Sequence, residues 1–301
     1  MPSYIQGLSE AIARAASRYP DLIQFGENIL QGSRICGLTR SLTGRVINVG
    51  NCENTHVGAG FGVMMRGGRA ALYMKQLDFL LLGVDQIVNT WNLLRAAPPD
   101  GMGSFTIVAI VCDQGWQGPQ SSFNALADLC SLARVDAYLL TDLHSAGAIL
   151  ASQLGAPGFR ILALSQRQFG AELLDVPVIW ASPDYRIFQY AEGDSATVAC
   201  FNFSLPQGLE LVGAWEQSGR TASLYSIHPA QPYSWGRVVE DAARTGRLIA
   251  IDDGKGANSL ANRLAAHVAR IAPGCRITID ARHGPVDYTV NEDRFEVELA
   301  W

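Results

Sequence analysis

Short apolar runs alternate with helix-like segments along most of the chain, and this alternation limits the folds available to it. The clearest run, Phe105–Val111, is apolar almost without interruption, as is typical of a strand buried on both faces of a parallel sheet. Repeated β–α units of this kind predict parallel sheets joined by right-handed crossover connections. We therefore expect an α/β fold with mostly parallel sheets and helices on both faces.

A polar, turn-rich segment at 182–195 divides this alternation into two parts. We expect a three-layer α/β/α domain over residues 1–184 and a second one over residues 195–301. A length of 301 residues with 48% hydrophobic content is sufficient for two such cores. The expected helices are 3–18, a short one within 31–43, one through 85–89, 123–133, 145–154, 208–217, 234–244 and 257–271. The expected strands are 22–25, 46–49, 70–74, 105–111, 137–141, 160–164, 176–180, 196–201, 222–227, 247–252 and 276–280.

The most informative local pattern lies between residues 47 and 95. A short apolar strand ends at Gly50-Asn51, and the carboxylate of Glu53 then precedes a helix that contains Gly58, Gly60 and Gly62. Small residues at this spacing let a helix approach a neighbouring element closely. A carboxyl group buried at such a junction would have a raised pKa and could hold a proton for a bound partner. The alternative is an ordinary carboxylate stabilised by the helix dipole.

Four segments of this stretch resemble a known family. Glu53-Asn54-Thr55, the glycine-rich helix, Leu77-Asp78-Phe79 and Asp85–Asn89 are similar to the pyrimidine-binding domain of thiamine-diphosphate-dependent enzymes. The resemblance is to the C-terminal half of transketolase and to the beta subunit of 2-oxo-acid dehydrogenases, and it covers about Tyr4 to Asp287. It implies a pyrimidine-binding domain followed by a transketolase C-terminal-like domain.

The resemblance also implies a chemical role for Glu53. Its carboxyl group would hydrogen-bond a ring nitrogen of the cofactor's aminopyrimidine and favour the imino tautomer that activates the thiazolium carbon. In the resembled family an aromatic side chain stacks on the pyrimidine ring. Tyr73 and Phe79 are the candidates here, because Gln76 occupies a position that is often Phe. We therefore expect Glu53, Tyr73, Gln76 and Phe79 to form the cofactor site.

Four other residues are candidates for contacts with a substrate. Glu27, which follows the first strand, would lie near the site or a subunit interface, or be a solvated loop carboxylate. His56 comes one helical turn after Glu53 and either faces the pocket or has a structural role. Gln120 and Ser121 follow the strand 105–111, where they could donate neutral hydrogen bonds or belong to an ordinary loop. The resembled enzymes carry histidines in this loop, and their replacement here indicates an unusual substrate, such as one from a specialised biosynthetic pathway.

The chain contains no Gly-Asp-Gly run, which in the resembled family helps to bind magnesium and the diphosphate group. A diphosphate without a cation or backbone amides is poorly compensated. The resemblance therefore implies that a partner chain, the alpha or N-terminal transketolase-like subunit, holds Mg²⁺ and shares thiamine diphosphate with this chain in a heterotetramer. No metal ligands are expected in this chain.

The implied activity is that of a transferase acting on a small molecule. The chain would be the pyrimidine-binding subunit of a split transketolase-like enzyme that transfers a two-carbon ketol or acyl unit. One alternative is the beta subunit of a decarboxylating 2-oxo-acid dehydrogenase-type enzyme, and another is a non-catalytic regulatory homologue. The presence of Glu53 argues against the latter, since a non-catalytic scaffold has no use for a costly buried acid.

Composition excludes other classes of partner. The net charge is −5 and the basic residues are scattered, so nucleic-acid binding is not expected. The six cysteines show no paired spacing, which favours reduced thiols, and no apolar run reaches the ~20 residues that a membrane span requires. The start of the chain does not resemble a secretory signal, so a cytoplasmic location is expected.

Overall fold

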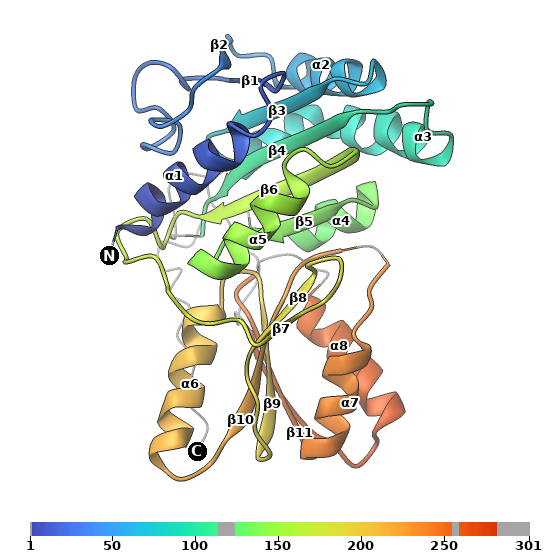
Figure 1. Ribbon diagram of the computed structural model, residues 1–301. Helices are drawn as coiled ribbons and strands as arrows, with labels where there is room; N and C mark the ends of the chain where they lie inside the picture. The colour runs from blue at the N-terminus through green and yellow to red at the C-terminus, as the bar shows by residue number, and fades with distance from the viewer. Residues whose placement is uncertain (1, 114–123, 231, 255–258, 282–301) are drawn as a thin grey trace, which may run out of the picture.

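The computed structural model describes residues 2–113, 124–230, 232–254 and 259–281. Two six-stranded sheets, each covered by helices, form the upper and lower halves of the molecule in Figure 1. The strands of the first sheet are β1 (Ile23–Gly26), β2 (Arg45–Asn48), β3 (Arg69–Met74), β4 (Ser104–Val111), β5 (Asp136–Leu139) and β6 (Gly158–Ser165). Their order is β2-β1-β3-β4-β6-β5, and all neighbouring strands are parallel.

Helices cover both faces of the first sheet. Apolar side chains of α1 and α5 pack on one face, and those of α2 and α4 pack on the other, so two separate cores form. The helical segments of this half are α1 (Tyr4–Ala16), α2 (Glu53–Met65), the 3₁₀ helix η1 (Leu77–Gly83), the π-helical turn η2 (Gln86–Thr90), α3 (Trp91–Ala96), α4 (Leu126–Ala133) and α5 (Leu143–Gln153).

The second sheet has the order β12-β11-β9-β10-β8-β7. Its strands are β7 (Trp180–Ala181), β8 (Ile187–Ala191), β9 (Ala196–Phe201), β10 (Ala222–Ile227), β11 (Arg247–Asp252) and β12 (Arg276–Ala281). The pairs β7–β8 and β8–β10 are antiparallel, and the other pairs are parallel. Helix α6 (Leu205–Gln217) packs on one face, and α7 (Gly236–Thr245) and α8 (Leu260–Ile271) pack on the other.

This architecture confirms the expected α/β fold with two mostly parallel sheets and helices on both faces. Several local expectations are wrong. The turn-rich segment 182–195 contains β8, no strand covers 176–179, and residues 31–43 form turns instead of a short helix. The expected helix through 85–89 is present, and it takes a π-helical form at η2 before it continues into α3. Since β7 and β8 already belong to the second sheet, the division into domains 1–184 and 195–301 stays a prediction.

A buried ion pair joins the two halves where the carboxyl ends of their strands meet. Arg167, which follows β6, contacts the fully buried carboxylate of Asp253 beyond β11 at 2.5 Å. The backbone amide of Arg167 also donates to Asp113, which follows β4, at 2.9 Å. Removal of one partner from a buried ion pair of this kind strongly destabilises a protein, because the other charge is left buried and uncompensated. The hydrogen bond to Asp113 fixes Arg167 within the first half, and the ion pair with Asp253 links the carboxyl ends of the two sheets.

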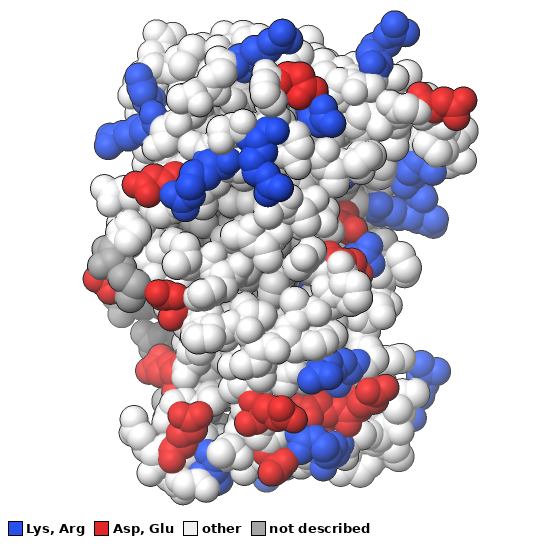
Figure 2. Space-filling view, viewed as in Figure 1, with Lys and Arg blue, Asp and Glu red and all other residues white. Residues whose placement is uncertain are grey.

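Basic and acidic side chains both occur on the face of the molecule shown in Figure 2, and neither sign covers this face alone. All six cysteines are free thiols. Among the described residues, no helix is both long enough and apolar enough to cross a membrane.

Candidate functional site

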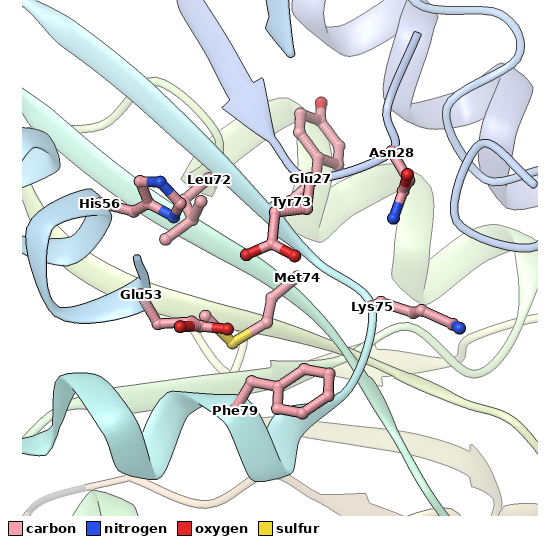
Figure 3. A pocket seen from close by; sticks show the side chains of 9 residues that line it. All are labelled: Glu27, Asn28, Glu53, His56, Leu72, Tyr73, Met74, Lys75 and Phe79. Carbon is pink, nitrogen blue, oxygen red and sulfur yellow. The ribbon is translucent and has the colours of Figure 1, made fainter. Parts of the chain in front are cut away.

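The first sheet has a topological switch point between β1 and β3. The chain passes from β1 to β2 on one side and returns to β3 on the other, as in the doubly wound folds that bind ligands beyond the carboxyl ends of these strands. A pocket that is open to solvent lies at this position (Figure 3). Its lining residues are Glu27, Asn28, Glu53, His56, Leu72, Tyr73, Met74, Lys75 and Phe79.

The end of β1 is shaped to bring Glu27 into this pocket. A Cβ atom on Gly26 would lie 2.3 Å from the carbonyl oxygen of Tyr73, so only glycine permits this approach of β1 to β3. Asn28 then adopts a φ of 55°, in the left-handed region that asparagine tolerates better than most residues. The amide of Ile29 donates to Asn48 Oδ1 at 3.0 Å, which ties the turn to β2.

Glu53 is the first residue of α2 and reaches the pocket from the side opposite Glu27 (Figure 3). It is partly exposed in this chain, so the full burial considered from the sequence is not observed. The helix N-terminus favours its negative charge. His56, one turn later, is 9% exposed and lines the same pocket. Burial lowers the pKa of His56, and the charge of Glu53 opposes that shift.

Glu27 and Glu53 form a pair of carboxyl groups in the pocket. Burial raises the pKa of Glu27, and the charge of Glu53 and a hydrogen bond between the two side chains raise it further. Like-charged carboxyl groups that share a site cannot both ionise easily, so one of them retains a proton at a higher pH than usual. The pocket can therefore hold a proton between Glu27, which follows β1, and Glu53 at the start of α2.

This raised pKa predicts a pH-dependent contribution of Glu27 to stability. The folded state binds the proton more tightly than the unfolded chain, so the stabilisation is present below the unfolded pKa of about 4.3 and is lost as pH rises through the folded pKa. The free energy of unfolding of the parent minus that of Glu27→Gln, measured by urea denaturation, should decrease from about pH 4 upward. The decrease should be smaller in a Glu53→Gln background, and a pH-independent difference would contradict the coupling.

Of the two aromatic residues expected to stack on the pyrimidine ring, Phe79 faces the pocket and Tyr73 points into the core. The Tyr73 side chain is 1% exposed and packs in the core beneath α1, with its hydroxyl donating to Gln24 Oε1 at 2.9 Å. Phe79 on η1 is partly buried and lines the pocket. A Cβ atom on Gly83 would lie 2.8 Å from Val57 Cγ2, so this glycine lets η1 press against α2. Phe79 is thereby fixed opposite the start of α2.

The structure brings four of the eight candidate residues together with their side chains toward the pocket: Glu27, Glu53, His56 and Phe79. Tyr73 borders the pocket with its ring in the core, and Gln76 adjoins the pocket without lining it. Gln120 and Ser121 lie outside the described residues.

Sequence reasoning missed Asn28, Leu72, Met74 and Lys75. The first three carry no chemical signal of their own. Lys75 does carry one, because it is one of only two lysines in the chain.

The lining suits one end of an aromatic heterocycle. A carboxyl group at Glu53 can bond a ring nitrogen, Phe79 offers an aromatic face, and the apolar side chains of Leu72 and Met74 complete the wall. These residues fit the aminopyrimidine ring of thiamine diphosphate. Within the described ranges, no group of three or more His, Cys, Asp or Glu side chains is arranged to hold a metal ion.

Sequence comparison finds relatives along nearly the whole chain. The chain is 21% identical over 309 residues to the pyruvate dehydrogenase E1 component subunit beta of Rhizobium meliloti (strain 1021), covering 96% of this chain and 65% of the relative. It is 20% identical over 282 residues to the acetoin:2,6-dichlorophenolindophenol oxidoreductase subunit beta of Cupriavidus necator, covering 89% and 83%. No protein-family model matches the chain.

Structure comparison agrees with these relatives. A split-gene transketolase, described as an inactive beta4 tetramer, superposes with a TM-score of 0.71 at 16% identity, covering 94% of this chain and 90% of that one. The chain is thus similar in sequence to beta subunits of 2-oxo-acid dehydrogenase-type enzymes, and its fold is that of transketolase. It is thus related to subunits of thiamine-diphosphate-dependent enzymes.

Proposed function

We propose that this chain is the pyrimidine-binding subunit of a thiamine-diphosphate-dependent enzyme that transfers a two-carbon ketol or acyl unit to a small-molecule acceptor. The observation that carries the proposal is the position of Glu53 at the start of α2, in a pocket at the β1/β3 switch point and opposite Phe79. Bound thiamine diphosphate would supply a nucleophilic carbon and an electron sink.

The residues of this chain then have separate tasks. The Glu53 carboxyl group holds or releases a proton at the aminopyrimidine nitrogen, while Phe79 orients the ring from its side. Glu27 shares a proton with Glu53, so the pair can keep one proton in the pocket when Glu53 changes its hydrogen bond. His56 has a lowered pKa and is suited to act as a neutral hydrogen-bonding group.

The other half of the site belongs to a partner subunit in this proposal. The chain has no Gly-Asp-Gly run, and the described residues that line the pocket include one lysine or arginine, Lys75, which is insufficient to compensate a diphosphate. The partner would hold Mg²⁺ and the diphosphate group and cover the partly exposed Glu53. A heterotetramer of two such pairs is the proposed assembly.

A decarboxylating 2-oxo-acid reaction is an equally supported second candidate. The relatives from Rhizobium meliloti and Cupriavidus necator both carry the name of an oxidoreductase or dehydrogenase subunit beta, whereas the structural relative is a transketolase. Release of CO₂ from pyruvate by the assembled enzyme would favour this second reaction. Transfer of a ketol unit to an aldehyde without CO₂ release would favour the first.

Binding of the cofactor should depend on the partner subunit. Calorimetry with magnesium present should detect no saturable binding of thiamine diphosphate to the isolated chain, and saturable binding to the complex that is purified with a tagged copy of this chain. The complex with Glu53→Gln separates cofactor binding from proton transfer, because the amide keeps the volume of the side chain. Tight binding to the isolated chain would contradict the split-site proposal.

A further inference from the structure

Lysine is almost absent from this protein. Of its 23 basic residues, 21 are arginines, and only Lys75 and Lys255 are lysines. The two side chains differ chemically, because the lysine ammonium is a compact, strongly hydrated charge on a flexible stem, whereas guanidinium is a planar fork. In a chain that uses arginine at nearly every basic position, a lysine inside the candidate site suggests a specific need for an ammonium group.

No ion pair forms between Lys75 and a carboxylate of the part of the chain that the structure describes. Lys75 follows β3 at the carboxyl edge of the sheet, is exposed, and is the one lysine or arginine among the described residues that line the pocket. Two carboxylates, Glu27 and Glu53, line the same pocket, yet no described carboxylate lies within 4.0 Å of the Lys75 ammonium. Figure 3 shows the Lys75 side chain directed away from both. The ammonium is therefore available to a ligand at the rim of the pocket.

We infer that Lys75 binds an anionic group, a carboxylate or a phosphate, of the small-molecule substrate. This inference rests on the proposed function, in which Glu53 and Phe79 face the cofactor ring and leave the opposite rim of the pocket to the substrate. The cofactor's own diphosphate would be held by the partner subunit. Hydrogen bonds to a charged group contribute enough that their loss should weaken substrate binding by about tenfold to a hundredfold.

The scarcity of lysine allows a direct measurement on the assembled complex. N-hydroxysuccinimide acetate acetylates free amines, and mass spectrometry can follow the peptides with Lys75 and Lys255 separately. The probes are glycolate for a carboxylate, glycerol 3-phosphate for a phosphate, and glycerol as the neutral control. We expect glycolate or glycerol 3-phosphate to slow acetylation of Lys75 at least threefold and to leave Lys255 unaffected, with glycerol inactive. The anion that protects at the lower concentration identifies the substrate class.

Variants test whether this protection reflects substrate binding. Lys75→Met removes the charge and nearly keeps the volume, and Arg66→Gln removes one charge at the exposed far end of α2 as a matched control. Calorimetry gives the dissociation constant of the protective anion. This constant should rise about tenfold or more in Lys75→Met and stay unchanged in Arg66→Gln. Lys75→Arg should recover only part of the affinity.

Two results would overturn the inference. One is unprotected Lys75 at high concentrations of both anions, and the other is full protection by the partner subunit without any small anion, which would make Lys75 an interface residue. Exchange of the thiazolium proton of bound thiamine diphosphate separates these results from failure of the proposed function. This exchange requires no substrate, so the parent complex and Arg66→Gln should both show it whether or not Lys75 binds an anion. Absence of exchange in the parent complex would refute the proposed function itself.

Discussion

Replacement of Glu53 by glutamine should slow exchange of the thiazolium proton of bound thiamine diphosphate by at least about a hundredfold in the assembled complex. Glutamine keeps the size and one hydrogen-bonding oxygen of the side chain but cannot hold or release the proton. General acid–base assistance is typically worth ~100- to 10,000-fold. A hundredfold loss corresponds to roughly 2.7 kcal/mol of activation free energy. Hydrogen–deuterium exchange followed by NMR measures this step without knowledge of the substrate.

The fold should survive this change. Glu53 is partly exposed at the first position of α2, so its replacement removes a favourable charge–dipole interaction of about 0.3–1 kcal/mol and creates no cavity. Glu10→Gln is a suitable control, because Glu10 is an exposed residue of α1 that pairs with Arg14 and does not line the pocket. If the Glu53→Gln complex exchanges the thiazolium proton as fast as the parent, Glu53 is not the activating acid and the thiamine-based proposal loses its chemical support.

The alternating pattern predicts the fold well because each β–α unit is local. Strands such as β4 are apolar along their whole length and end at clear turn residues, so their existence and parallel pairing follow from the sequence. Strand β8 was missed because its neighbours are Ser182, Pro183 and Asp184, which indicate a turn. Its partner β10 lies more than thirty residues later in the chain. Pairing with this distant strand and with the two-residue strand β7 makes the short segment a strand.

Prediction of the candidate site from the sequence is limited in the same way by contacts between distant segments. The position of Glu53 and Phe79 follows from motifs within one stretch, whereas the approach of Glu27 depends on the parallel pairing of β1 with β3. That pairing also decides the direction of Tyr73, whose neighbours Leu72 and Met74 point to the opposite face of β3. Alternation along a strand follows from the sequence, but which face meets the pocket depends on the helices that cover it.

Replacement of Gly60 by alanine should lower the free energy of unfolding by about 1–3 kcal/mol. Alanine normally stabilises a helix relative to glycine, but a Cβ atom here would lie 2.2 Å from Phe105 Cε2. The Phe105 ring cannot move away easily, since Phe61 packs against its edge at 5.1 Å and Phe159 stacks on it at 5.3 Å. The overpacking therefore outweighs the gain in helix propensity.

Gly62 on the same helix provides the matched control. It is exposed, and a Cβ atom there would meet nothing within 4 Å, so Gly62→Ala should raise the free energy of unfolding by about 0.5–1 kcal/mol. Urea denaturation of the two variants should thus give midpoints that move in opposite directions from the parent. Equal shifts would show that α2 does not press against β4 at Gly60. In that case, the close contact that positions Glu53 beside the sheet would have to arise at another point of the helix.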